Sequence, residues 1–168
     1  MDIIAHGLWA GAAAQWLRHD RVAISGRMVA ATVVLAVAPD ILPVVPVVAW
    51  SFSEPAPLRF LYEHVAALPG AEPRMPALAY QISHHLHCAA HSIVVAGVAT
   101  AVLWRLRPRL VLPLMGWWLH IALDIPTHSN DYYAVPFLYP ITYWGMNGIA
   151  WTTPWLLAVN YGALAAAY

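Results

Sequence analysis

The chain contains 168 residues, of which 61% are hydrophobic and 10% are charged, whereas soluble domains are roughly 45–50% apolar and about 25% charged. This hydrophobicity excludes a disordered chain. Eight arginines are balanced by eight carboxylates, which leaves no basic stripe of the kind that nucleic-acid binding requires. The composition therefore predicts an integral membrane protein. The single cysteine, Cys88, excludes an internal disulfide and a cysteine-based metal site.

Five apolar stretches follow one another along the chain, and each reaches or approaches the ~20 residues that a helix needs to cross a bilayer. They cover residues 3–17, 28–50, 77–106, 110–125 and 148–168. Helix is the expected state of all five, because an isolated strand in lipid leaves its backbone groups unpaired. We therefore expect one all-α domain over residues 1–168, built as a polytopic transmembrane bundle of four to five helices.

The first stretch has an alternative interpretation as a signal peptide, because the alanines at 12–14 imitate a cleavage site. Signal peptides begin with a positively charged region. This stretch has no arginine before residue 18, and it carries Asp2. We therefore expect it to remain in the protein as a membrane helix.

Two short basic connections, residues 18–27 and 105–109, set the expected orientation. Each contains three arginines, and loops rich in arginine stay on the cytoplasmic side. Two crossings separate the two connections, so both lie on the same side. The prediction is a multi-pass protein of the cell membrane whose N-terminus faces the non-cytoplasmic side.

Two longer connections are expected on the non-cytoplasmic side. Residues 51–76 are rich in proline and mixed in charge, and we expect an amphipathic helix at about 58–68 that lies at the interface and acts as a lid. Residues 126–147 carry six tyrosine, phenylalanine and tryptophan side chains that suit the aromatic belt of a membrane interface.

Five ionisable residues occupy one predicted depth in four of the apolar stretches. They are His6, Asp40, His91, His120 and Asp124. Each lies 11–15 residues from the nearest cytoplasmic arginine, which is roughly 17–22 Å along a helix that rises ~1.5 Å per residue. Ionisable groups inside a membrane are costly and mark functional sites. The common depth predicts that all five meet in one layer near the outer face.

Local spacing supports this layer. His120 and Asp124 are four residues apart and share a helix face, and His84, His87 and His91 are spaced to share another face. Pro39 is expected to kink its helix and to turn Asp40 inward.

Imidazoles and carboxylates together suit a divalent metal of the zinc class, with manganese and iron as alternatives. We predict that His6, Asp40, His91, His120 and Asp124 hold one or two such ions. His128, which follows the turn at Pro126, or His87 is then expected to act as the catalytic proton acceptor.

The remaining histidines also have structural interpretations. His84 and His87 suit ligands or groups that support the ligands, whereas His85 and Cys88 suit helix packing. His19 lies in a basic connection, and His64 lies on the expected interfacial helix.

The combination of motifs resembles the YdjM-like family of membrane-bound metal-dependent hydrolases. The matching residues are His6, Pro39-Asp40, His91-Ser92, His120-x-x-x-Asp124 and the following 125–129, which together cover residues 1–130. The family's third motif carries an arginine and a threonine that residues 85–92 lack. The pattern is more remotely similar to helical zinc-dependent phospholipases C. The resemblance implies a metal-dependent hydrolase in the membrane.

Four functions are compatible with these residues. The first is a hydrolase in which metal-activated water attacks an ester or phosphoester, including that of a membrane lipid. The second is a metal carrier or sensor with a closed coordination shell. A haem or electron-transfer protein would use His91 and His120 as an axial pair, although Asp40 and Asp124 do not suit axial positions. A scaffold held by polar contacts between helices does not explain the common depth.

Overall fold

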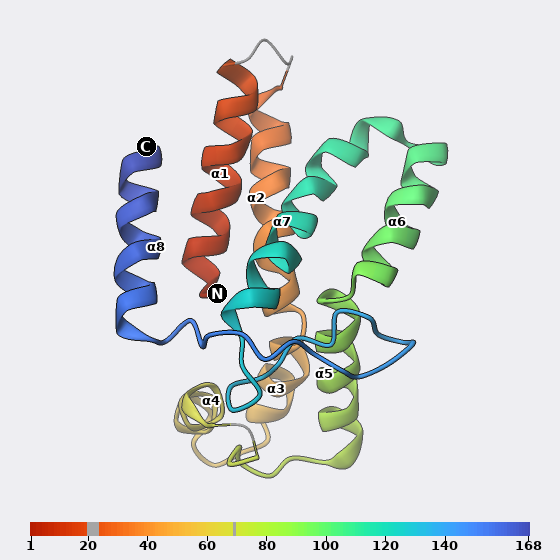
Figure 1. The fold of residues 1–168 in the computed structure, drawn as a ribbon. Helices are drawn as coiled ribbons and strands as arrows, with labels where there is room; N and C mark the ends of the chain where they lie inside the picture. The colour runs from red at the N-terminus through yellow and green to blue at the C-terminus, as the bar shows by residue number, and fades with distance from the viewer. Residues whose placement is uncertain (20–23, 69) are drawn as a thin grey trace.

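The computed structural model describes residues 1–19, 24–68 and 70–168, and these residues form an all-helical chain without a β-sheet (Figure 1). The α-helices are α1 (Ile3–His19), α2 (Gly26–Ile41), α3 (Val44–Ser51), α4 (Pro57–Ala66), α5 (Ala77–Ala90), α6 (Ile93–Leu106), α7 (Val111–Thr127) and α8 (Pro154–Ala167). A short 3₁₀ turn, η1 (Pro108–Leu110), precedes α7. The all-α class predicted from the sequence is therefore confirmed.

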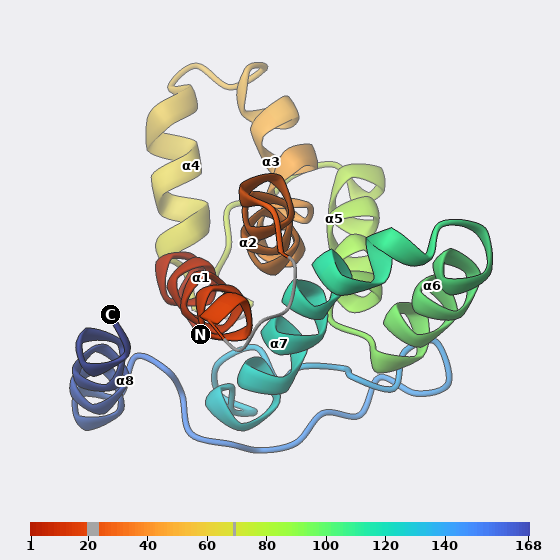
Figure 2. The same cartoon turned by 90° about the horizontal axis from the view of Figure 1, so that it is seen from above.

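Helix α2 lies at the centre of the fold, and its most extensive contacts are with α7 and α1 (Figure 2). The backbones of α2 and α7 touch at Gly116. A β-carbon at this position would lie 2.0 Å from the carbonyl oxygen of Thr32, so any larger residue would separate the two helices. Glycine at residue 116 therefore sets how closely the two helices approach each other.

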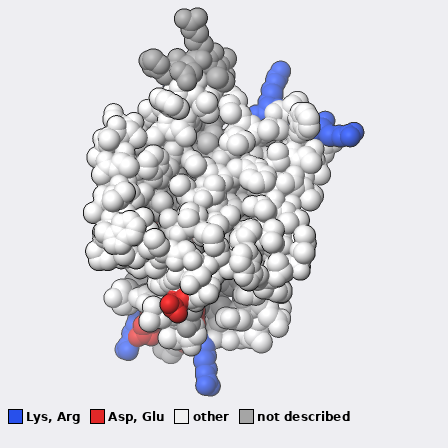
Figure 3. Space-filling model, viewed as in Figure 1, with Lys and Arg blue, Asp and Glu red and all other residues white. Residues whose placement is uncertain are grey.

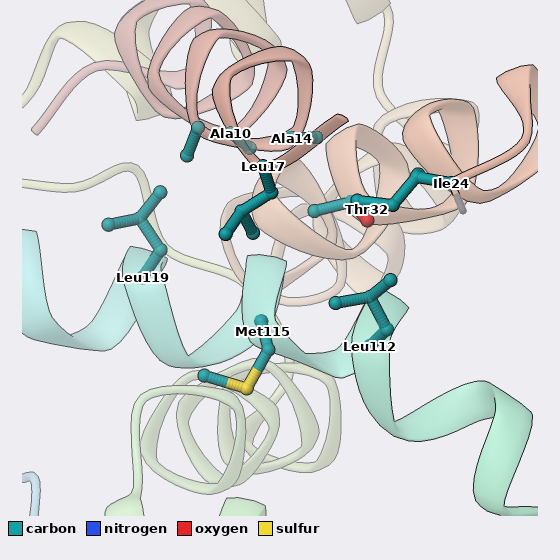
Figure 4. Close-up of a pocket in the computed structure, with 9 residues that line it drawn as sticks. Ala10, Ala14, Leu17, Ile24, Thr32, Leu112, Met115 and Leu119 are labelled. Carbon is teal, nitrogen blue, oxygen red and sulfur yellow. The ribbon is translucent and has the colours of Figure 1, made fainter. Parts of the chain in front are cut away.

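The same three helices line a small cavity of about 40 Å³ (Figure 4). Its lining is apolar except for Thr32, whose hydroxyl donates a hydrogen bond to the carbonyl of Met28 at 2.9 Å. With no polar group left to hold a ligand, this cavity is a packing feature.

Two of the predicted membrane stretches are bent. Helices α2 and α3 meet at an angle of 61°, where Pro43 precedes α3, and helices α5 and α6 meet at 67°. The second bend lies at His91 and Ser92, because the Ser92 hydroxyl accepts hydrogen bonds from the N–H groups of Val94 and Val95 and begins a new helix there. The apolar stretch predicted over residues 77–106 is therefore two helices, although His87 and His91 still lie side by side with ring centroids 4.2 Å apart.

The number of candidate membrane spans is one to three within the described residues, fewer than the four to five predicted. Residues Pro108–Thr127 form one helix that is long and apolar enough to cross a bilayer, and each bent pair adds one more if it crosses as a unit. Helix α8 begins only at Pro154, so the last apolar stretch is shorter than expected and its residues 148–153 are irregular.

Charged side chains on the face shown in Figure 3 lie at two opposite ends and leave a broad uncharged band between them. The corner between α6 and α7 carries exposed arginines, and it lies at the same end as the C-terminus of α1 and the start of α2 (Figure 1). Asp20 and Arg21 of the first basic connection lie outside the described residues. This distribution suits a helical bundle inserted in a bilayer.

The opposite end carries α4, close to the position predicted for the amphipathic helix. Its apolar side chains Leu58, Tyr62 and Val65 are exposed, while Phe60 on the other side is buried. The segment that holds α4 is tied to the later aromatic segment by one hydrogen bond, which the Tyr133 hydroxyl donates to Glu72 at 2.5 Å.

Candidate metal centre

The five residues of the predicted layer come together where several helices begin or end. His6 lies in the first two turns of α1, Asp40 at the end of α2, and His91 in the break between α5 and α6; His120 and Asp124 lie in the last turns of α7. The side chain of Asp40 is 21% exposed, whereas the other four are 0–1% exposed. The layer is therefore a buried cluster that can be reached from the side of Asp40.

Four of these residues form the metal-ligand cluster, defined here as Asp40, His91, His120 and Asp124, in which one possible ligand atom from each lies within 4.8 Å of all the others. The two Nε2 atoms of His91 and His120 are 3.0 Å apart. Asp124 Oδ2 lies 3.1 Å from His120 Nε2 and 3.4 Å from His91 Nε2. Asp40 Oδ1 lies 3.7 Å and 3.5 Å from the same two nitrogens. Ligand atoms bound to one tetrahedral ion at ~2.0–2.3 Å lie about 3.3–3.7 Å apart, which is close to these separations.

The hydrogen bonds of the two central histidines fix their tautomers. His120 Nδ1 lies 2.7 Å from the carbonyl oxygen of Ala36, and His91 Nδ1 lies 2.8 Å from that of His87. A carbonyl only accepts hydrogen bonds, so each Nδ1 carries a proton and donates it. The neutral rings therefore present the lone pairs of their Nε2 atoms to each other and to the carboxylates, as metal-binding histidines do.

This arrangement suits a positive charge at its centre. Two lone pairs that face each other at 3.0 Å repel, and two ionised carboxylates beside them add to the repulsion. A proton on one Nε2 would relieve that contact and could also face Asp124 Oδ2, which lies 3.1 Å from His120 Nε2, but it supplies one positive charge against two carboxylates. Asp40 Oδ2 and Asp124 Oδ2 are also buried without a hydrogen-bond partner. A divalent cation balances both carboxylates and uses both lone pairs, so the residues present fit a metal ion.

His6 lies on the other side of the two carboxylates and outside the metal-ligand cluster. Its Nε2 is 2.9 Å from Asp124 Oδ1 and 4.0 Å from Asp40 Oδ2, and its ring stacks on His120 with centroids 3.8 Å apart. Both ring nitrogens of His6 are buried without a hydrogen-bond partner. Each carboxylate thus directs one oxygen toward the metal-ligand cluster and the other toward His6. The N-terminal amine also contacts Asp124 Oδ1.

The irregular chain after α7 holds the end of this helix in place. Pro126, Thr127 and His128 offer carbonyls that accept hydrogen bonds from Ile149, Trp151 and Gly148, at 2.8–2.9 Å. A β-carbon at Gly148 would lie 2.2 Å from the Pro126 carbonyl oxygen. The close approach that glycine permits fixes the last turn of α7, which carries Asp124.

The two predicted proton acceptors lie beside the metal-ligand cluster and not within it. His128 Nδ1 is 3.1 Å from the backbone carbonyl of Asp124 and 3.6 Å from its Oδ1. The ring of His87 packs against that of His91, with centroids 4.2 Å apart. His128 is buried, whereas His87 is partly exposed.

The other histidines near the break contact tyrosines. His84 stacks between Tyr80 and Tyr143 and lies 3.6 Å from Cys88 Sγ, and His85 Nδ1 lies 3.2 Å from the Tyr139 hydroxyl. His64 on α4 stacks on Phe60. The structure brings none of these three histidines to the metal-ligand cluster.

Sequence reasoning missed the residues that position the ligands. Gly116 and the carbonyl of Ala36 place His120, and Ser92 places His91 by starting α6 and by donating to the carbonyl of Tyr139. Serine after histidine was the available signal for a helix start, because serine is a preferred N-cap residue.

Comparison with known proteins finds no matching family model, no matching curated protein and no matching solved structure.

Proposed function

We propose that this protein is a membrane-embedded, metal-dependent hydrolase that cleaves an ester or phosphoester. The observation that supports the proposal is the pair of buried Nε2 atoms, 3.0 Å apart, whose lone pairs face each other beside two carboxylates. The resemblance of the His6, Pro39-Asp40, His91-Ser92 and His120-x-x-x-Asp124 motifs to the YdjM-like hydrolases supports the class of reaction.

The metal-ligand cluster would hold a first divalent ion, with zinc favoured by two imidazoles and two carboxylates. His6, Asp124 Oδ1 and Asp40 Oδ2 would hold a second ion. A bound ion of this kind lowers the pKa of a water and polarises the bond to be cleaved. Asp40 is the ligand exposed to an incoming substrate.

Hydrolysis adds the oxygen of water to the acyl carbon or phosphorus and returns a proton to the departing alkoxide oxygen. His128 is suited to carry this proton, because its Nδ1 is held by the carbonyl of Asp124 and its Nε2 remains available. His87 is the second candidate for the proton carrier, since its ring lies against that of His91.

The alternative to a hydrolase is a metal carrier or sensor, and the number of protein ligands favours it. The metal-ligand cluster supplies four ligand atoms, three of them from fully buried side chains, and four protein ligands are typical of closed, non-catalytic sites. A haem with His91 and His120 as axial ligands is disfavoured, because axial nitrogens lie about 4 Å apart across the iron and these nitrogens are 3.0 Å apart.

The membrane arrangement belongs to the same proposal. The first and last helices and the two bent pairs would cross together with α7, which gives a multi-pass protein. The arginine-rich end would lie in the cytoplasm, and the metal-ligand cluster would face the non-cytoplasmic side.

Elemental analysis of the detergent-purified protein tests the proposal. Near-stoichiometric zinc, manganese or iron is expected, and its complete loss when His120→Ala is combined with Asp124→Ala. His84→Ala is the matched control, because this histidine packs against Tyr80, Tyr143 and His85 and lies near Cys88, outside the metal-ligand cluster. Absence of metal from the folded wild-type protein contradicts the proposal, and bound metal without hydrolysis of any ester or phosphoester tested favours the carrier or sensor.

A further inference from the structure

A second cavity of about 220 Å³ opens beside the metal-ligand cluster, between α2, α5, α6 and α7. The arrangement of these helices is seen in Figure 2. Its lining includes Leu35, Pro39, Leu42, Leu86, Ala90 and Trp117. An apolar cavity of roughly 150 Å³ admits benzene, so this one has room for an alkyl segment of about six carbons or more. We call it the side groove.

The side groove offers nothing that would hold a polar ligand. Every side chain that lines it is apolar apart from the indole of Trp117, and that indole N–H already donates to the carbonyl of Ala90 at 2.5 Å. Leu42, in the lining of the groove, is 45% exposed. In a chain inserted in a bilayer, such an opening meets hydrocarbon and not water.

The side groove and the metal-ligand cluster share their walls. Pro39 lines the groove and directly precedes Asp40, Ala90 lines it and directly precedes His91, and Trp117 lines it one turn before His120. In three separate segments of the chain, a residue that lines the groove is thus followed, one to three positions later, by a residue of the metal-ligand cluster. A molecule that fills the groove would therefore contact residues that lie one to three positions from Asp40, His91 and His120.

We infer that the side groove holds the hydrocarbon chain of the substrate, so that the substrate is a lipid ester or phosphoester whose polar end lies at the metal-ligand cluster. This inference rests on the proposed hydrolase. It adds that an acyl or alkyl chain enters sideways from the bilayer, because the groove accepts hydrocarbon and the exposed ligand, Asp40, lies next to Pro39 in its wall.

Photolabelling tests occupancy of the groove without relying on activity. The probe is a single-chain glycerophospholipid with a diazirine in its acyl chain, added to the full-length, metal-loaded protein. The groove is filled by Ala89→Leu, or by Val95→Phe as a second variant, and the control is Ala13→Leu, which fills the other cavity in the same way. Metal content is measured for each variant to show that the cluster still forms.

Saturable labelling at the groove residues is expected in the wild type and in Ala13→Leu, with a loss of about tenfold in Ala89→Leu and Val95→Phe at unchanged metal content. Labelling that does not saturate, or that is equal in the groove and control variants, overturns the inference. If a groove variant loses metal, the comparison is decided by the other one and by competition of unlabelled lipid in the wild type.

Hydrolysis of p-nitrophenyl acetate and p-nitrophenyl dodecanoate, and of methyl and dodecyl p-nitrophenyl phosphate, separates the two proposals. The long-chain compound of the cleaved pair is expected to react at least about tenfold faster than the short one, and the groove variants should remove this advantage. Equal rates for short and long chains leave the hydrolase standing and reject the groove as a substrate site. Saturable labelling without any hydrolysis rejects the hydrolase and leaves a lipid-binding groove.

Discussion

His120 donates the hydrogen of its Nδ1 to the backbone carbonyl of Ala36, 84 residues earlier in the chain, at 2.7 Å. The same offset of 84 residues relates Gly116 to Thr32, one turn before, and Asp124 to Asp40, one turn after. Helices α7 and α2 thus run side by side in one register from Gly116 to Asp124, over about two turns. The first pair sets the distance between the helices, the second orients an imidazole, and the third brings two carboxylates together.

Gly116→Ala is expected to destabilise the protein and to reduce its metal content. The added β-carbon would lie 2.0 Å from the Thr32 carbonyl oxygen, which belongs to the backbone and moves only if the helices separate. Overpacking of this kind costs about 1–3 kcal/mol. Thermal unfolding and elemental analysis measure the two effects.

Gly97→Ala is the matched control, because no atom outside the local helix lies within 4 Å of its added β-carbon. Replacing a glycine inside a helix by alanine stabilises by about 0.5–1 kcal/mol, so the control should not lower the melting temperature. A Gly116→Ala protein with wild-type stability and metal content would refute the register described above.

His6→Ala is expected to lower the metal content from about two ions per chain to about one, because His6 would hold only the second ion. His64→Ala should leave the metal content unchanged, since His64 contacts Phe60 on α4. Elemental analysis at saturating metal gives both numbers. A wild-type content of one ion, kept in His6→Ala, would restrict the site to the metal-ligand cluster.

Ser92→Ala is expected to cost about 1 kcal/mol of stability, because the hydroxyl caps α6. It should also weaken metal binding, since His91 then loses the fixed bend that directs it. Ser25→Ala is the control, because Ser25 caps the N-terminus of α2, at the opposite end of that helix from Asp40. It should lower stability without changing the metal affinity. Competition with a chelator measures the affinity, and equal affinities in the two variants would contradict this account.

Tyr133→Phe is expected to loosen the segment that carries α4. Burial raises the pKa of Glu72, but the hydrogen bond from Tyr133, together with backbone hydrogen bonds at Gly70 and Glu72 and the nearby His64, brings the pKa below its usual value. A carboxyl whose pKa is lowered on folding stabilises the folded state at a pH above its pKa in the unfolded chain. This stabilisation is lost as the pH falls through its pKa in the folded protein. Protection of α4 from hydrogen exchange should therefore fall at pH ~7 in Tyr133→Phe, and in the wild type only below about pH 4.

Tyr132→Phe is the control for this change, because the ring of Tyr132 makes edge contacts with Tyr133 and Trp151 that survive loss of the hydroxyl. Equal protection of α4 in both variants, after correction for intrinsic exchange, would mean that the Tyr133–Glu72 bond does not hold the two segments together.

The orientation is tested with single cysteines at two exposed serines at opposite ends, Ser25 and Ser53, in a Cys88→Ser background. An impermeant reagent added to intact cells should label Ser53→Cys and not Ser25→Cys. Labelling of Ser25→Cys from outside would reverse the orientation, and labelling of both in sealed cells would contradict a membrane-spanning arrangement.

The features that could be predicted from the sequence are those that depend on composition and on residue spacing along one helix. Most of the apolar stretches became helices, and the similar distances of His6, Asp40, His91 and His120 from the arginines matched their common layer. The break at His91 was not predicted, because it depends on Ser92 and on the distant carbonyl of Tyr139. Gly148 was assigned to a helix, whereas it packs against Pro126. The helix break at His91 and the irregular backbone at Gly148 both depend on contacts between residues far apart in the chain.

The ligands of the metal-ligand cluster come from α2, α7 and the junction of α5 with α6, so no single segment of the chain can hold an ion. A cation bound there would link α2, α7 and the junction of α5 with α6, which the ribosome synthesises at different times. Such an ion would favour the assembled chain by about 1.4 kcal/mol for every tenfold rise in its free concentration above the dissociation constant. Metal supply would then control how much of this protein survives in the membrane as well as how much of it is active.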